Sequence, residues 1–248
     1  MDPVLLITGA SRGIGAATAL LAARKGYAVA VNYARNEAAA EKVAHTIREG
    51  GGKAIIVQAD VADEAQVLAM FAQVDSRLGR LTALVNNAGV VDSAQRVDEM
   101  SVERWKRMFD VNVTGTFVCA REAVKRMSTR HGGQGGAIVN LSSAAARLGS
   151  PGQYVDYAAA KGAIDVFTLG LAKEVAAEGI RVNAVRPGLI DTEIHASGGL
   201  PNRVQELAHQ VPMLRGGTAE EVAQAILWLL SDQASYTTMS ILDVAGGR

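Results

Sequence analysis

The chain has 248 residues but a single cysteine, Cys119, and only four histidines. One cysteine excludes an intrachain disulfide and any zinc or iron–sulfur site built from several thiolates, and it fits a reducing compartment. We expect no metal site, because the histidines are scattered along the chain without ligand spacing: His45, His131, His195 and His209.

The chain also lacks an excess of charge of either sign, since 25 Lys and Arg residues balance 25 Asp and Glu residues. Proteins that bind nucleic acid draw much of their affinity from surplus Lys and Arg, so we expect no nucleic-acid partner. No apolar run approaches the roughly 18 residues of a membrane span. The apolar residues 4–7 follow no basic region, so we expect neither a signal peptide nor a membrane anchor, and we predict a cytoplasmic location.

Short apolar runs do alternate with alanine-rich segments of helical period. The expected strands are residues 4–7, 28–31, 54–57, 81–85, 137–141, 180–185 and 240–244. The expected helices are residues 14–25, 37–49, 64–78, 102–127, 157–177 and 219–230. This alternation is typical of right-handed crossovers in an α/β fold, with a parallel sheet and helices on both of its faces. No linker divides the chain, so we predict one domain over residues 1–248, with a lid over the substrate at about residues 188–212.

The first expected strand leads directly into a glycine-rich turn, Thr8-Gly9-Ala10-Ser11-Arg12-Gly13-Ile14-Gly15, and a helical pattern follows. Glycines let the backbone turn tightly and approach a ligand, and the free N–H groups at a helix start attract a pyrophosphate. A dinucleotide site is therefore the functional interpretation. The alternative is a tight turn that binds nothing, and the spacing does differ from the common G-x-G-x-x-G.

Two further positions carry chemistry. Tyr157 and Lys161 lie four residues apart in a helical stretch, so both side chains can share one helix face. An ammonium there favours the phenolate and is expected to lower the tyrosine pKa from about 10. The alternative is an exposed tyrosine beside a solvated lysine.

Ser142 and Ser143 follow the strand expected at 137–141. Because neighbouring residues in an extended chain point to opposite faces, we expect only one of the two serines to reach a ligand.

Taken in order, T-G-x-x-x-G-x-G, Asn86-Asn87-Ala88-Gly89, Tyr157-x-x-x-Lys161, Pro187-Gly188 and Asp243-Val244-Ala245-Gly246-Gly247 resemble the short-chain dehydrogenase/reductase family over essentially the whole chain. The resemblance implies a three-layer Rossmann fold with a seven-stranded sheet, a nicotinamide cofactor, and hydride transfer between an alcohol and a carbonyl. The sequence looks most like bacterial glucose-1-dehydrogenase-like oxidoreductases. The alternatives are a 3-oxoacyl-[acyl-carrier-protein] reductase, disfavoured by the acidic Glu174 and Glu178, and a nucleotide-binding regulator without catalysis.

The resemblance also implies residue roles. Tyr157 is the acid/base, Lys161 holds the nicotinamide ribose and tunes Tyr157, Ser143 polarises the substrate oxygen, and Asn112 interrupts a helix and anchors a proton relay. The residues implied to bind the cofactor are Gly9, Ser11, Arg12, Gly13, Ile14 and Gly15 in the turn, Asp60 and Val61 at the adenine, Asn87, Ala88 and Gly89 at the adenosine ribose, Pro187 and Gly188, and Ile190 with Thr192 at the carboxamide. The family further implies a homotetramer in which helices 102–127 and 157–177 pair between subunits.

The end of the second expected strand bears on the choice between cofactors. NAD-selective Rossmann proteins place a carboxylate there, and it repels a 2′-phosphate. This chain reads Asn32-Tyr33-Ala34-Arg35-Asn36, with no acid until Glu37. Asn32 is expected to donate hydrogen bonds at this corner, and Arg35 and Arg12 offer planar cations suited to phosphate. We therefore predict NADP(H) as the preferred cofactor, with NAD(H) possible if both arginines point into solvent.

Overall fold

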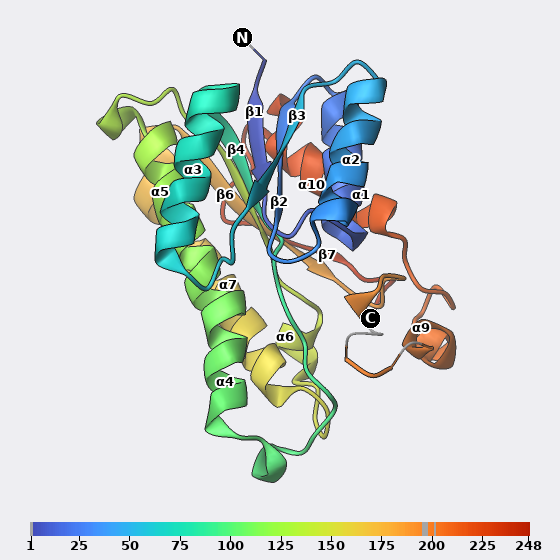
Figure 1. Ribbon diagram of the computed structural model, residues 1–248. Coiled ribbons are helices and arrows are strands. Elements are labelled where there is room, and N and C mark those ends of the chain that lie inside the picture. Colours follow the sequence, from blue (N-terminus) through green and yellow to red (C-terminus); the bar gives the residue numbers. More distant parts are fainter. Residues whose placement is uncertain (1, 195–197, 201) are drawn as a thin grey trace.

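The computed structural model describes residues 2–194, 198–200 and 202–248. Its centre is a parallel sheet of seven strands in the order β3-β2-β1-β4-β5-β6-β7 (Figure 1). The strands are β1 Val4–Ile7, β2 Ala28–Tyr33, β3 Ala54–Gln58, β4 Leu81–Asn86, β5 Gly136–Leu141, β6 Ile180–Pro187 and β7 Ile241–Val244. The predicted three-layer α/β fold is confirmed, and each strand lies where an apolar run predicts it.

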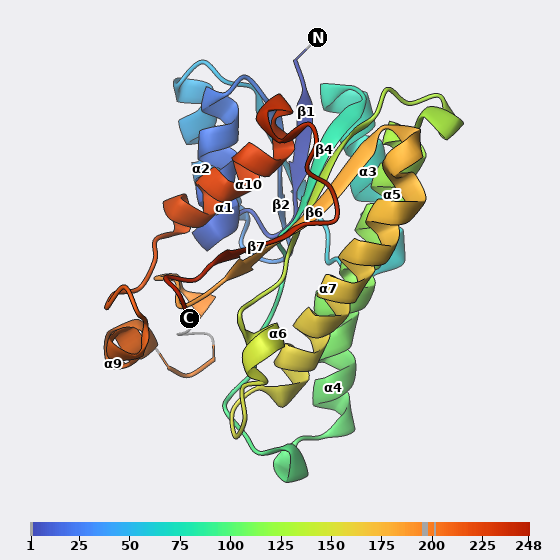
Figure 2. The same ribbon diagram turned by 180° about the vertical axis from the view of Figure 1, so that it is seen from behind.

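Helices cover both faces of the sheet, as Figures 1 and 2 show from opposite sides. One face carries α1 Gly13–Arg24, α2 Glu37–Glu49 and α10 Ala219–Leu230. The other carries α3 Glu64–Leu78, α5 Gly115–Met127 and α7 Val155–Val175. Shorter helices are α4 Val102–Phe109, α6 Ala145–Leu148 and α9 Arg203–Leu207, with single 3₁₀ turns at η1 Val97–Glu99, η3 Thr129–His131, η4 Ala176–Glu178, η5 Ala208–Gln210 and η6 Asp232–Ala234. None of the described helices is long and apolar enough to cross a membrane.

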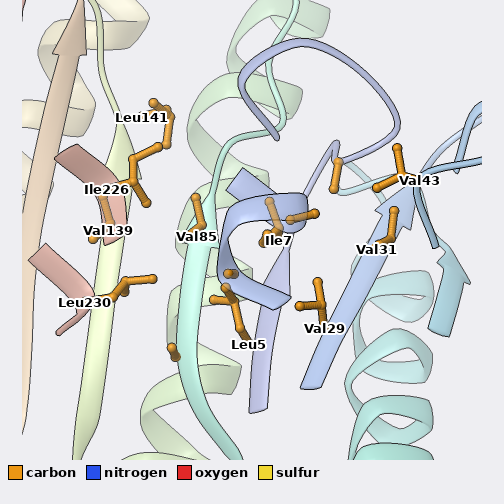
Figure 3. Packing of buried hydrophobic residues seen from close by; sticks show 14 of the residues in the cluster. Leu5, Ile7, Val29, Val31, Val43, Val85, Val139, Leu141, Ile226 and Leu230 are labelled. Atoms are coloured by element: carbon orange, nitrogen blue, oxygen red, sulfur yellow. The ribbon is translucent and has the colours of Figure 1, made fainter. Parts of the chain in front are cut away.

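The strands are apolar throughout because both sheet faces are buried. Leu5 and Ile7 belong to the core beneath α1, α2 and α10, a cluster that also contains Val29, Val31 and Ile226 (Figure 3). Val4 and Leu6, the alternate residues of the same strand, belong to the core beneath α3, α5 and α7. The two-residue period of a strand thus divides one continuous apolar run between two cores.

One predicted helix is interrupted. The expectation of a single helix over 102–127 is wrong, because α4 and α5 are separated by a π-helical turn, η2 Asp110–Thr114. Inside that turn the Asn112 side-chain Nδ2 donates to the Met108 carbonyl at 3.0 Å. A single π-turn inserted into an α-helix re-aims the residues it contains, and such turns are frequent at functional sites. The resemblance-based expectation that Asn112 interrupts a helix is confirmed.

Beyond the carboxyl ends of the strands, α4, α6 and the first half of α7 project away from the sheet (Figure 1). A buried ion pair joins α4 to α7: Arg104 of α4 donates to both carboxylate oxygens of Asp156 in α7, at 2.7 and 3.2 Å. The same guanidinium donates to the Ser93 carbonyl and to Gln95 Oε1 in the loop after β4. Arg104 therefore fixes the start of α7, and with it the position of Tyr157.

Candidate active site

A cavity of about 520 Å³ opens where β4, β5 and β6 end. Ligand sites of α/β sheets are expected at this edge. Ten of the predicted site residues line it: Ile14, Asn87, Gly89, Ser143, Tyr157, Lys161, Pro187, Gly188, Ile190 and Thr192. Sequence positions spread over most of the chain thus meet in one cavity.

Three of these side chains form its polar centre. Tyr157 and Ser143 share a side-chain hydrogen bond. Lys161 Nζ lies 5.7 Å from the centroid of the Tyr157 ring and donates to the Leu141 carbonyl at 2.6 Å. The alternative of a solvated lysine is wrong, because Lys161 is only 4% exposed. Ser142 has a different task, since its buried hydroxyl donates to the Lys161 carbonyl and holds the helix.

The titration behaviour of the pair departs from the prediction. The expected lowering of the Tyr157 pKa is wrong for this structure: burial raises the phenol's pKa and outweighs the opposing effect of the Ser143 hydrogen bond. Burial also disfavours the charged form of Lys161 and lowers its pKa to about 8, although the Asp165 carboxylate acts in the opposite direction. Desolvation is therefore the largest cause of the pKa shift of both groups.

Asn112 reaches the same centre from the π-turn. Its side chain accepts from Val90 N at 3.1 Å and donates to the Val90 carbonyl at 3.0 Å, so it clamps the loop after β4. A Cβ added at Gly89 would lie 2.7 Å from Asn112 Oδ1 and 3.5 Å from Lys161 Nζ. The loop, the asparagine and the lysine thus approach one another through the space that a glycine leaves open.

The glycine turn adopts a backbone that its sequence explains. Gly9 and Gly13 have φ of 62° and 55°, a region that favours glycine. A Cβ at Gly15 would lie 2.6 Å from Asn87 Nδ2. Asn87 itself donates to the carbonyls of Thr8 and Gly9, both at 2.9 Å, so the motif after β4 fastens the turn after β1. Ser11 and Arg12 lie between these glycines, and Ala88 packs directly against Gly9.

At the end of β2 the structure corrects one prediction. Asn32 is buried, and its amide donates to the Val57 and Ala59 carbonyls while its Oδ1 accepts from Gly9 N at 3.0 Å. It therefore holds the glycine turn in place and does not present its donors to a ligand, because backbone carbonyls already take them. Tyr33 is likewise buried, in the core beneath α1 and α2.

Four further residues that we predicted to bind the cofactor do not line the cavity: Arg12, Arg35, Asp60 and Val61. Arg35 is exposed, and so is Arg12, which immediately precedes α1. The Asp60 carboxylate accepts from Ala62 N, and Val61 is buried against Gly115. Ile190, which does line the cavity, pairs with Gly217 in an isolated bridge within the segment predicted as a lid. His195, one of the four histidines, lies outside the described residues.

The sequence indicated the other lining residues only as members of two segments expected to shape the pocket, residues 147–154 and the predicted lid. Gln153 and Tyr154 precede α7, and Arg203, Leu207 and Gln210 come from α9 and its continuation. A loop position gives no local signal of the direction of its side chain, so only the packing of α9 could identify them. Among the described residues no group of three or more His, Cys, Asp or Glu side chains is arranged to hold a metal ion.

Comparison with known proteins places this geometry in context. Residues 9–248 match the family described as "Enoyl-(Acyl carrier protein) reductase". The chain is 60% identical over 245 residues to the "Uncharacterized oxidoreductase YgfF" of Escherichia coli K12, covering 99% of both chains. It is 39% identical to the "3-oxoacyl-[acyl-carrier-protein] reductase FabG" of Staphylococcus aureus, covering 100% of this chain and 98% of the other. A double mutant of a Serratia marcescens short-chain dehydrogenase/reductase superposes with a TM-score of 0.91 at 35% identity, covering 99% and 97% of the two chains.

Proposed function

This chain belongs to the short-chain dehydrogenase/reductase family, and we propose that it transfers hydride between a nicotinamide cofactor, preferably NADP(H), and a small carbonyl or alcohol substrate. The observation that carries the proposal is the meeting of Ser143, Tyr157 and Lys161 at one end of the cavity, with the glycine turn as its other boundary.

The residues present fit a dinucleotide. The first N–H groups of α1 have no partner within the helix, and they start directly at Gly13, where the backbone is open to a close approach. In the proposal the turn from Gly9 to Gly15 holds the pyrophosphate, Asp60 and Val61 the adenine, and Ile190 and Thr192 the carboxamide. The bound nicotinamide supplies or accepts the hydride.

The side chains then handle the proton and the substrate oxygen. Tyr157 donates its phenolic proton to the oxygen as a carbonyl is reduced. Ser143 donates a hydrogen bond to the same oxygen. Lys161 binds the nicotinamide ribose and stabilises the phenolate left behind. Asn112 positions the loop beside Lys161 and anchors the relay that returns a proton.

Two substrate classes follow from the sequence. The first is a sugar of the kind oxidised by glucose-1-dehydrogenase-like enzymes. The second is a 3-oxoacyl thioester, which is favoured by one observation, the 39% identity to the Staphylococcus aureus FabG protein over nearly its full length. A panel of glucose, related sugars and 3-oxoacyl thioesters, followed by absorbance of the reduced nicotinamide, separates these classes.

The proposal includes a cytoplasmic homotetramer. Large apolar side chains are exposed on the α4, α5 and α7 side of the subunit: Trp105, Phe109, Phe117, Val166 and Leu169. Exposed apolar patches of this kind mark interfaces, and pairing of these helices about a two-fold axis would cover them. Light scattering of a diluted sample tests the assembly, and a monomer that persists at high concentration contradicts it.

Replacing Tyr157 by Phe tests the mechanism directly. The change removes the phenolic hydroxyl and leaves the ring, so cofactor binding should persist while kcat falls by at least about 100-fold. Turnover on an identified substrate and cofactor affinity by fluorescence titration are the two measurements. Undiminished turnover would overturn the assignment of Tyr157 as the acid/base.

A further inference from the structure

The end of the cavity away from the glycine turn holds a fixed cation. Arg203 of α9 donates from Nη2 to Gln153 Oε1 at 2.7 Å, and its guanidinium carbon lies 5.4 Å from the centroid of the Tyr154 ring. Both partners precede the first turn of α7, within four residues of Tyr157. These contacts orient the planar cation against the segment that carries the acid/base.

The charge of this cation is not balanced by the cavity lining. Among the described lining residues the charged side chains are Lys161, Arg203 and Arg248, and none is an acid. Lys161 belongs to the polar centre. The described contacts of Arg203 are an amide oxygen and an aromatic ring, and neither of them is an ion pair. A guanidinium has five N–H donors in a fork that matches an anionic oxygen pair, so Arg203 retains donors for a ligand.

The neighbours of this cation differ from those of the glycine turn, where we expect the pyrophosphate. A Cβ added at Gly13 would contact Thr192 Cγ2 at 3.4 Å, so the start of the lid lies over the glycine turn. A Cβ added at Gly198 would lie 3.4 Å from Tyr154 Oη, so the lid has reached the other end of the cavity by that residue. Arg203 follows Gly198 and contacts the same tyrosine. Its ligand is therefore part of the substrate and not the cofactor phosphates.

We infer that the substrate carries a carboxylate, bound by Arg203 while its carbonyl lies at Ser143 and Tyr157. The substrate class is then an oxo acid, or the corresponding hydroxy acid in the reverse direction. This rests on the proposed hydride transfer at the reacting centre, and it replaces the sugar and the 3-oxoacyl thioester as substrate classes, because neither of them carries a carboxylate. In the reduction, hydride from the reduced nicotinamide forms the new C–H bond, the Tyr157 proton forms the O–H bond, and the carboxylate is unchanged.

Matched acids and methyl esters test the charge alone. The probes are pyruvate, acetoacetate and levulinate with their methyl esters, which place the carboxyl group at three distances from the ketone. Calorimetric titration of the enzyme with bound cofactor measures binding, and loss of reduced nicotinamide measures turnover. We expect one acid to bind at least about tenfold more tightly than its ester. Equal binding of acid and ester in every pair would overturn the inference.

Two variants assign the preference to the residue. Arg203→Gln keeps a donor but removes the charge, so the preference for acid should fall to near unity while ester binding is retained. Arg24→Gln, at an exposed position in the last turn of α1, should leave the preference unchanged. An acid preference that survives Arg203→Gln would overturn the role of Arg203. Charge-dependent binding without turnover would support the inference and contradict the hydride-transfer function. Turnover of acids and esters alike would support hydride transfer and contradict the inference.

Discussion

The two ends of the cavity are built in different ways. At the glycine turn the backbone itself forms the site, through the positive φ of Gly9 and Gly13 and the N-terminus of α1. At the other end the site consists of side chains from distant segments, held by Arg104 with Asp156 and by Arg203 with Gln153. A site made of backbone is legible in a short motif. A site made of side-chain contacts between distant segments is not, and the proposed substrate end of the cavity is of this kind.

The largest effect expected from this difference is at the buried ion pair. Arg104→Met leaves the Asp156 carboxylate buried without its partner, so the free energy of unfolding should fall by about 3–5 kcal/mol. Arg107→Met on the same helix breaks only an exposed pair with Asp92 and should change it by less than about 1 kcal/mol. Urea unfolding measures both. Equal effects of the two variants would show that the far end is not held by this pair.

A smaller effect is expected where the loop after β4 meets the polar centre. Gly89→Ala adds a Cβ that would lie 2.7 Å from Asn112 Oδ1, so the clamp must shift and stability should fall by about 1–3 kcal/mol, with a loss of turnover. Gly50→Ala is the control, because its Cβ would meet nothing closer than 3.5 Å and its φ of −76° suits alanine. Thermal unfolding and kcat of both variants test this, and a Gly89→Ala protein as active as the control contradicts it.

The next largest effect is expected at the end of β2, in the preference for NADP(H) over NAD(H). One charge-assisted bond to a 2′-phosphate contributes about 1.5–3 kcal/mol, so the wild type should prefer NADP(H) over NAD(H) by at least about tenfold in kcat/KM. The double variant Arg12→Ala, Arg35→Ala should lose that preference with little change in kcat/KM for NAD(H). Equal values for the two cofactors in the wild type would mean that both arginines face solvent, as the alternative supposed.

The smallest effect is expected in the pH dependence that follows from the charge of Lys161. This residue lies between the two ends of the cavity. Its pKa of about 8 predicts that kcat/KM for carbonyl reduction falls above pH 8 as the ammonium is lost. The free energy of unfolding should change in the opposite direction. Between pH 8 and the ordinary lysine pKa of 10.5, the unfolded chain holds a proton on Lys161 that the folded chain has lost. The contribution of Lys161 to stability therefore rises with pH over that window.

Asp165 is expected to set the pH at which kcat/KM falls, that is, the alkaline limb of the pH profile. It lies one helical turn beyond Lys161 and raises the lysine pKa, while its own Oδ2 accepts from Arg186 at 2.8 Å. Asp165→Asn should therefore move the limb to lower pH, by up to about one unit. Glu174→Gln, an exposed change on the same helix, should leave it in place. A limb that does not move would remove Asp165 from the mechanism.

Much of the site could be predicted from sequence because its motifs are local. Tyr157 and Lys161 share a helix face through their spacing, and Gly9 to Gly15 stand between a strand and a helix as predicted. Two of the failures, at Asn32 and Tyr157, have a common cause, which is burial. Asn32 has the chemistry of a ligand donor, yet the packing of β2 against β3 gives its amide to backbone carbonyls. The Tyr157 pKa rises because desolvation outweighs the hydrogen bond with Ser143, and the spacing of Tyr157 and Lys161 gives no sign of that burial.

The sequence by itself determined the order of the elements, the sheet between two helical layers, and the residues of the glycine turn and the polar centre. Hydrophobic period and local backbone preference decide these properties, and both act over a few residues. Only the tertiary structure decided that Asn32 faces inward, that Arg104 locks the start of α7, and that Arg203 reaches the cavity. Each depends on contacts between segments far apart in the chain, and the direction of a side chain in such a contact follows from packing rather than from its neighbours in sequence.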